Sequence, residues 1–468
     1  MTRILLCLSN SILVNDEFKT ACFAEQLITE LQRYGNDVLV FNPRLFNKRA
    51  FQSENELKED ISEEDLRQNI ISFAPELIIS FNNANYAKIL EITDCPIVIW
   101  NADLAYRWNQ RELIKNNLER YTFFSFSDFA IKETQELLGF KNNQCHCVKG
   151  ATALHSRNIP QPINISFIGS CFKTDPALCL LIKKYSGQND LLKLMAAIAE
   201  NPFITQKKIL ELIAENKELQ QDVMDISFEQ YPNFFSAQKR LQTLLNISDL
   251  GLALYGTENW LELSASFPSL TAAFHQEIIY SAQQNEDIYN FSKIAININH
   301  CQASQGMPWR VPDIMATNGC LLCDYSPFIA DCFKSFVKIP MFTNSFEARD
   351  LSQKLLKDNI WRQDLIQASN NVIDAEWRWH HRFKQMEEIL NISLLNQNEG
   401  KMQMLKPLAL PPKPEPIKTE PPKVEIPQPV PTPQAKPIRV NRSCCTLKLQ
   451  YKIWKHLKKK LKQKGILQ

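Results

Sequence analysis

Short, nearly uninterrupted apolar runs alternate with stretches of helical length along the first part of the chain. The runs are rich in Val, Ile, Leu and Phe and stand at 3–9, 37–42, 75–82, 95–101, 121–127 and 144–149. Apolar runs without polar alternation are typical of strands buried on both faces of a sheet. Between them lie an amphipathic stretch at 18–34 and an acidic one at 54–73, both predicted to be helices.

A second series of the same kind follows. Its apolar runs stand at 163–172, 249–256, 293–300, 319–325 and 336–340. Regular strand–helix–strand order predicts a parallel sheet with helices on both faces. At 468 residues the chain is also too long for one ordinary core. We therefore expect an α/β protein with two doubly wound, Rossmann-like domains, at 1–158 and 159–395, the second with a helical insert at 176–246.

The composition changes sharply beyond the second domain. Twelve of the 25 prolines lie between Pro407 and Pro437, so 396–440 is predicted to be an extended, disordered linker without a core. The segment 441–468 has no Asp or Glu and many lysines, and on a helix its apolar residues share one face. Such a basic amphipathic helix favours an anionic membrane surface as its partner. The alternatives are nonspecific RNA binding and a plain solvated helix.

Composition and charge place the bulk of the chain among soluble proteins. It is 44% hydrophobic and 22% charged, and its net charge of +2 gives no global sign of a nucleic-acid partner. The 13 cysteines are scattered and odd in number, which fits reduced thiols in the cytosol. We predict a cytoplasmic protein whose membrane contact, if made, is peripheral at the inner face, because no segment has the length of a membrane span.

The stretch "GMPWRVPDIMATNGCLLCD" at 306–324 is the strongest candidate site. Pro312 suits the first turn of a helix and Gly319 the left-handed position that ends one, so a short helix is predicted over 311–318. The amides at its N-terminus would attract an anion, and Arg310 would add a planar fork of donors for phosphate oxygens. Asp313 could accept hydrogen bonds from ribose hydroxyls. The alternative is a surface ion pair between Arg310 and Asp313.

Four segments of the C-terminal half, in the order "ISFIGS", "LALYGTENW", "KIAININ" and "GMPWRVPDIMATNGCLL", resemble the CgeB-like (spore maturation protein type) glycosyltransferases. That family carries a glycine-containing loop, an Arg-x-x-Glu pair that opens a helix, and a turn of a small residue and Gly into the next strand. In the N-terminal half, "SFNN" and "IVIWNADLAYRW" resemble the acceptor domain of the same group. The likeness spans residues 1–395.

The resemblance implies a GT-B fold, in which two Rossmann-like domains face a cleft and the second binds most of the sugar-nucleotide donor. Arg310 stands where the family has its Arg, and Asp313 where it has a Glu. Because Asp is shorter than Glu, either the nucleotide lies closer or this contact is lost. Gln305 stands where related GT-B enzymes often have another Glu, and it carries no charge. The implied donor-binding residues are Gly169, Ser170, Tyr255, Gly256, Gly306, Arg310 and Asp313.

Asp103 is the first candidate for the base that would deprotonate an acceptor hydroxyl. It follows the predicted strand at 95–101, at the carboxyl edge of the sheet. A helix-capping role explains the same residue, and a retaining mechanism would need no such base. His155 and His300 could also face the cleft, although a histidine at such a position is more often an ordinary polar loop residue.

The sequence contains no Asp-x-Asp motif, which glycosyltransferases of the other common fold use to hold a divalent cation. We therefore predict no metal and no cofactor, with Arg310 and the helix amides stabilising the departing diphosphate. Cys320 and Cys323 are read as residues on opposite faces of a strand and not as a metal site.

The predicted activity is transfer of a sugar from a nucleoside-diphosphate donor to a glycan or lipid-linked acceptor, as in the synthesis of cell-envelope polysaccharide. The alternative is a non-catalytic GT-B-like module that binds nucleotide or glycan and acts in assembly through its linker and tail.

Overall fold

The fold is described from a computed structural model. It describes residues 1–405 except 9–10, 15–16, 43–62, 83, 85–88, 103–110, 173–174, 202–203, 205, 228–229 and 302–305. The predicted Pro-rich linker beyond 405, the basic tail and Asp103 lie outside the described residues.

The N-terminal half forms a seven-stranded parallel sheet in the spatial order β14–β4–β1–β5–β6–β7–β8. Each predicted strand of this half is confirmed, and the apolar side chains of the strands are buried on both faces of the sheet. The strands are β1 (Arg3–Cys7), β4 (Asp37–Phe41), β5 (Leu77–Phe81), β6 (Ile97–Asn101), β7 (Tyr121–Ser125), β8 (Cys145–Cys147) and β14 (Met402–Met404).

The first predicted helix begins later than the sequence pattern indicated. Residues Glu17–Thr20 form β3, which pairs antiparallel with β2 (Ser11–Val14), so their backbone groups bond across a hairpin and not within a helix. The extended backbone of Ala21, with φ −73° and ψ 152°, then leads into the helix. The helices of this half are α1 (Cys22–Arg33), α3 (Glu63–Phe73), α4 (Ile89–Ile92), α5 (Arg111–Lys115) and α6 (Asp128–Leu138), with 3-10 turns η3 (Leu118–Arg120) and η4 (Asn142–Gln144).

The C-terminal half contains a five-stranded parallel sheet in the order β10–β9–β11–β12–β13. The predicted strand at 336–340 is wrong in position: the fifth strand follows Pro340, which has no N–H to donate to a ladder. The strands are β9 (Ile163–Ile168), β10 (Leu252–Tyr255), β11 (Ser292–Asn297), β12 (Cys320–Asp324) and β13 (Met341–Phe342).

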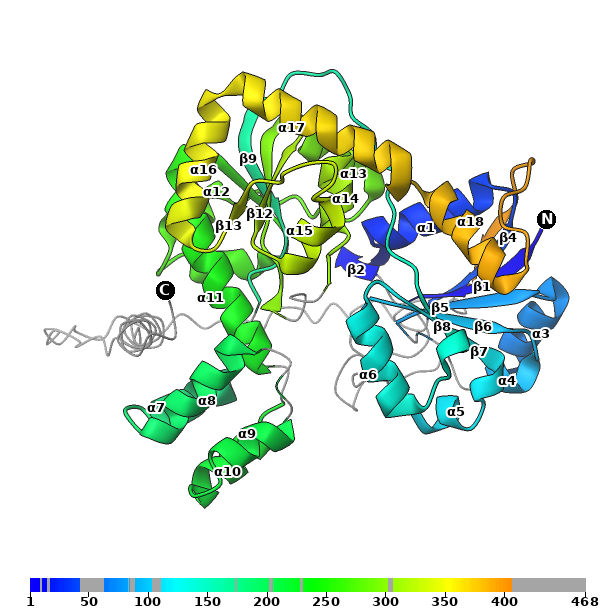
Figure 1. Cartoon of the computed structure of the whole chain (residues 1–468), viewed down its shortest axis with the longest axis horizontal. Coiled ribbons are helices and arrows are strands. Elements are labelled where there is room, and N and C mark those ends of the chain that lie inside the picture. The colour runs from blue at the N-terminus through cyan, green and yellow to red at the C-terminus, as the bar shows by residue number, and fades with distance from the viewer. Residues whose placement is uncertain are drawn as a thin grey trace, which may run out of the picture. The chain divides into compact units, whose positions relative to one another are not determined.

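Helices pack around the second sheet. The predicted helical insert contains α7–α11, of which α7–α10 extend away from this sheet (Figure 1). Pro176 opens the first of them at the N-terminal turn, where its missing N–H costs nothing. The helices are α7 (Pro176–Lys184), α8 (Asn189–Glu200), α9 (Gln206–Leu212), α10 (Lys217–Met224), α11 (Gln230–Ile247), α12 (Pro268–Ala273), α13 (Ala282–Phe291), α14 (Arg310–Met315), α15 (Pro327–Phe333) and α16 (Ser345–Lys357), with 3-10 turns η5 (Ser248–Leu250) and η6 (Glu258–Leu263).

The chain returns from the second sheet to the first through α17 (Asn359–Val372), a π-helical turn η8 (Ile373–Trp377) and α18 (Trp379–Leu390) (Figure 1). Trp377 is buried in the core of the second sheet, whereas Trp379, two residues later, is buried in the core of the first. These two aromatic residues therefore fix the returning segment to both cores. The ordered chain continues past the predicted domain end at 395, because β14 pairs with β4.

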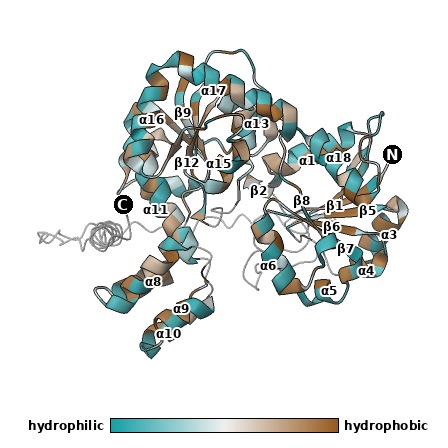
Figure 2. Ribbon diagram, viewed as in Figure 1, coloured by the Kyte–Doolittle hydropathy of each residue, from teal (hydrophilic) through white to brown (hydrophobic). Residues whose placement is uncertain are grey.

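Apolar side chains fill the space on both faces of each sheet. Figure 2 shows the strands coloured mainly as hydrophobic, whereas α16 and α17 carry many hydrophilic residues. Cys320 and Cys323 lie in β12 on opposite faces, in two different hydrophobic cores, as their spacing predicted. Within the described part of the chain, no helix has the length and apolar character needed to cross a bilayer.

Candidate functional site

The strand order of the second sheet marks one position as the natural ligand site. From β9 the chain moves outward to β10 and then back across to β11, so the helical connections leave in opposite directions at the carboxyl ends of β9 and β11. Ligands of doubly wound sheets bind in the crevice at such a switch point. The first sheet reverses in the same way between β1 and β5.

Arg310 lies at this switch point of the second sheet. Its guanidinium carbon is 5.5 Å from the centroid of the Phe167 ring, and Nη1 donates a 3.3 Å hydrogen bond to Asn297 Oδ1. Phe167 belongs to β9 and Asn297 ends β11. A methyl group added at Gly169 would lie 3.3 Å from Nη2, so this nitrogen is next to the loop after β9. The predicted anion-binding residue therefore lies where the topology places a ligand.

Asn297 holds the guanidinium through a buried hydrogen-bond network. Its Nδ2 donates to Asn299 Oδ1 at 2.8 Å and to Cys323 Sγ at 3.2 Å, which leaves Oδ1 to accept from Arg310. Asp324 accepts from the Asn299 amide at 2.9 Å. An arginine oriented in advance loses less entropy when it binds a phosphate.

The predicted residues of the first two loops lie together beside Arg310. The Gly169 amide donates to Tyr255 O at 2.9 Å, and Gly169 O accepts from Trp260 Nε1 at 2.9 Å. Gly256 has a φ of +151°, and a Cβ there would lie 2.1 Å from Gly169 O. Only glycine permits this approach of the two loops. Tyr255 is buried and stacks on His275, with ring centroids 4.7 Å apart.

Arg240, on α11, is a second cation of the site that sequence reasoning missed. Its guanidinium carbon is 4.1 Å from the Phe172 ring centroid and 5.5 Å from that of Phe167. It donates to Ser170 O at 2.6 Å and to Ile298 O at 3.3 Å. Burial, and secondarily the charge of Arg310, lower the pKa of Arg240 to about 9, so it remains a cation at neutral pH. No sequence signal separates it from other helical arginines.

The helix amides predicted to bind the anion are largely occupied, so that part of the prediction is wrong. The helix spans only Arg310–Met315. The Val311 amide donates to Pro308 O at 3.0 Å, the Asp313 amide donates to Trp309 O at 3.2 Å, and Pro312 has no N–H. Gly319 does not adopt a left-handed conformation at the end of the helix either. The positive charge of the site therefore comes from side chains.

Asp313 lies away from the expected ribose position. It is 5% exposed, and Oδ1 accepts from Thr152 Oγ1 at 2.6 Å and from Gln26 Nε2 at 3.2 Å, while Oδ2 is 3.9 Å from Cys22 Sγ. Burial raises the pKa of Asp313 to about 6, although these donors act in the opposite direction. The shorter side chain thus meets protein donors, so the structure does not support the ribose contact.

The remaining candidates divide into three groups. Gly306 is described, and a Cβ added to it would meet no heavy atom of the described residues within 4 Å. His300 follows β11, where its Nε2 lies 2.9 Å from Asn233 Oδ1, whereas His155 is exposed and its amide donates to Glu286. Asp103 and Gln305 lie outside the described residues.

The charges at the switch point favour a polyanion. Arg310 and Arg240 both lie against the Phe167 ring. The charge of Lys239, in contrast, is balanced by Asp324 at 2.6 Å. Bidentate arginine donors match the spacing of phosphate oxygens. In the described residues, no group of three or more His, Cys, Asp or Glu side chains is arranged to hold a metal ion.

Comparison with known proteins gives one family match and several structural neighbours of low sequence identity. Residues 233–388, which include Arg240 and Arg310, match a protein-family model described as glycosyl transferase-like. The structure is similar to sucrose-phosphate synthase from Thermosynechococcus elongatus, at 10% identity and a TM-score of 0.50, over 84% of this chain and 98% of that one. HepE of Anabaena, solved with UDP and glucose, gives 12% identity and a TM-score of 0.42 over 84% of this chain and 100% of that one. No curated protein matches by sequence.

Proposed function

We propose that this chain, a glycosyltransferase with a GT-B fold, moves a sugar from a nucleoside-diphosphate donor to a glycan or lipid-linked acceptor without a metal ion. The observation that supports it most strongly is the guanidinium of Arg310 at the switch point between β9 and β11. Gly169, Ser170, Tyr255, Gly256 and Gly306 complete the donor-binding loops. The motifs at 163–172 and 306–324 support a CgeB-like subgroup.

The proposed reaction breaks the bond between the anomeric carbon of the sugar and a β-phosphate oxygen. The bonding electrons leave with the diphosphate, and Arg310 stabilises the negative charge that develops on it. Arg240 adds a fixed positive charge beneath the same loop. An acceptor hydroxyl forms the new bond to the anomeric carbon and gives up its proton, and we propose Asp103 as the base that receives it.

The basic segment 441–468 supports a peripheral position at the inner face of the membrane. About 1 kcal/mol for each basic residue near an anionic bilayer would allow reversible attachment. The acceptor would then be a lipid-linked or envelope glycan. Nucleic acid is the less favoured partner, because the net charge of the whole chain is only +2.

A thermal-shift screen of the full chain against UDP, GDP, ADP and their sugars tests donor binding. We expect one nucleoside diphosphate and its sugar to raise the melting temperature in proportion to occupancy, with the same shift in EDTA. The sugar nucleotide should also release its diphosphate slowly when incubated with the enzyme. If EDTA removed the shift, the metal-independent form of the proposal would fail.

The same experiment separates the alternative function. A chain that binds the nucleotide but releases no diphosphate, even with lipid-linked acceptors, would be a non-catalytic module that acts in assembly. If no nucleotide changed the melting temperature, both nucleotide-dependent proposals would fail.

A further inference from the structure

The helix that carries Arg310 is fixed to the first domain through Asp313. Gln26 belongs to α1, and its Nε2 donates to Asp313 Oδ1 while its Oε1 accepts from the Ala153 amide at 2.6 Å. Thr152, in the segment after β8, donates to the same Asp313 oxygen at 2.6 Å. We call Gln26, Thr152 and Asp313 the Asp313 cluster. All three residues are buried, with exposed fractions of 3%, 0% and 5%.

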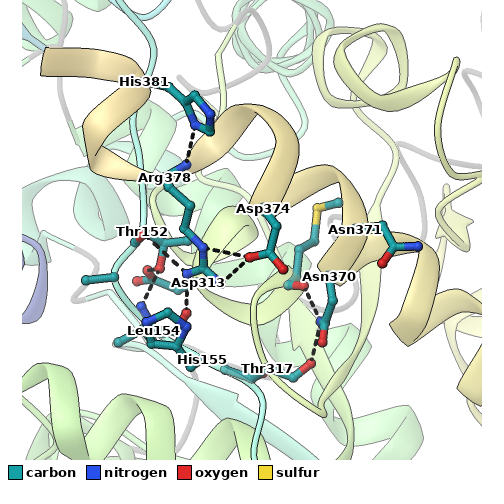
Figure 3. Close-up of polar contacts among 12 residues, drawn as sticks. Thr152, Leu154, His155, Asp313, Thr317, Asn370, Asn371, Asp374, Arg378 and His381 are labelled. Carbon is teal, nitrogen blue, oxygen red and sulfur yellow. Dashed lines mark hydrogen bonds and ion pairs between the residues drawn. The ribbon is translucent and has the colours of Figure 1, made fainter. Parts of the chain in front are cut away.

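The returning segment of the chain fixes the Thr152 side of this cluster. The Thr152 amide donates to Trp377 O at 3.0 Å, and Arg378 Nη1 donates to Leu154 O at 2.5 Å. Arg378 is in turn held by Asp374 through hydrogen bonds of 2.8 and 2.9 Å. Figure 3 shows the Arg378 side chain between Asp374 and the backbone at Thr152 and Leu154, with Asp313 beside Thr152.

The C-terminal end of the same helix is held from α17. Asn370 Nδ2 donates to Met315 O at 2.8 Å, the last carbonyl of α14, and to Thr317 O at 3.0 Å, two residues beyond the helix (Figure 3). A six-residue helix has little stability of its own. Its position therefore depends on these external bonds.

Trp309 holds the N-terminal side. Its ring stacks on Phe23 of α1 with centroids 3.3 Å apart and meets Phe126 edge-on at 4.6 Å. Gly150 leaves the space for it, because a Cβ at this glycine would lie 2.3 Å from the Trp309 ring. The residue directly before Arg310 thus packs, half-buried, against the core of the first sheet.

We propose that Thr152, Gln26 and Asp313 are positioning residues: they bind α14 to the first domain and so set the guanidinium of Arg310 against the departing diphosphate. This inference rests on the proposed function. Asp313 then acts through the backbone of α14 and does not touch the nucleotide. Donor binding needs the loops of the second domain, whereas stabilisation of the leaving group needs contacts from the first.

Matched variants at Thr152 and Asp313 separate this role from direct nucleotide contact. Thr152→Val removes the hydroxyl at nearly constant volume, and Thr152→Ser keeps it. Asp313→Asn keeps Oδ1, which accepts both bonds, and Asp313→Ala removes it. We expect Thr152→Val and Asp313→Ala to lower kcat for donor turnover at least tenfold with KM changed less than threefold, because the leaving-group contact strengthens in the transition state. Thr152→Ser and Asp313→Asn should stay within about threefold of wild type.

Two results would overturn the proposal. If Asp313→Asn and Asp313→Ala both lowered nucleotide affinity more than tenfold, the carboxylate itself would contact the nucleotide. If Thr152→Val left kcat unchanged, the bond to Thr152 would not position Arg310.

Hydrogen exchange of the 310–315 amides gives a readout that does not depend on turnover. We expect faster exchange in Thr152→Val and wild-type rates in Thr152→Ser. If wild type bound no nucleotide while exchange followed this pattern, the proposed function would fail and the fixing of α14 would stand. Unchanged exchange in Thr152→Val would contradict the fixing itself.

Discussion

Replacing Arg310 with alanine is expected to lower donor turnover about 10²- to 10³-fold, the usual loss when one donor to a developing oxyanion is removed. The reason is that Arg310 supplies the half-buried cation at the switch point, while the amides of α14 are largely paired within the protein. Nucleotide affinity should fall much less, because the loops at Gly169 and Gly256 remain. Release of nucleoside diphosphate from the sugar nucleotide measures the effect.

Two further variants serve as controls. One keeps the positive charge at residue 310, and the other removes an arginine outside the site. Arg310→Lys keeps the charge but loses the planar fork, so an intermediate rate is expected. Arg349→Ala removes an arginine that pairs with Asp249 at 2.5 Å on the surface of the second domain, and its turnover should match wild type. Equal turnover in Arg310→Ala and wild type would show that the leaving group is stabilised elsewhere.

Replacing Trp309 with alanine is expected to cost about 3 kcal/mol of stability, the lower end of the range for large aromatic residues, because this ring is only half-buried. The loss should appear in urea unfolding monitored by circular dichroism. Turnover should also fall, since the ring joins the segment next to Arg310 to Phe23 and Phe126.

Trp361→Ala is a suitable comparison, because that tryptophan is also half-buried but packs against the core of the second sheet. We expect it to lower stability while turnover per folded molecule stays near wild type. A Trp309→Ala protein with unchanged turnover would show that Arg310 does not depend on this ring.

Much of the fold is predictable because buried parallel strands leave a strong sequence signal. The runs that became β1, β5 and β6 are almost entirely apolar, and each forms a strand fully or largely buried in its sheet. The signal is weaker where a strand is short or partly polar. The sequence pattern did not indicate β14, at Met402–Met404, because its three residues are mostly exposed and follow a polar stretch.

The sequence predicted a residue of the candidate site correctly only where that type of side chain binds mainly one kind of ligand. Arg310 next to Pro312 indicated an anion site, and the structure places it at the switch point. The prediction for Asp313 was wrong because a carboxylate at this position can accept hydrogen bonds from a ribose or from residues of the first domain. Thr152 and Gln26, its partners, lie 161 and 287 residues away in sequence, so only the fold brings them together. Arg240 was missed because only the fold brings it next to Ser170 and the other residues of the site.

The most direct test of the central claim is a crystal structure of the full chain with the nucleoside diphosphate that gives the largest thermal shift. We predict that the diphosphate lies at the carboxyl ends of β9 and β11, beside Gly169, with at least one oxygen within hydrogen-bond distance of the Arg310 guanidinium. A diphosphate bound elsewhere, with no oxygen near the Arg310 guanidinium, would contradict the account.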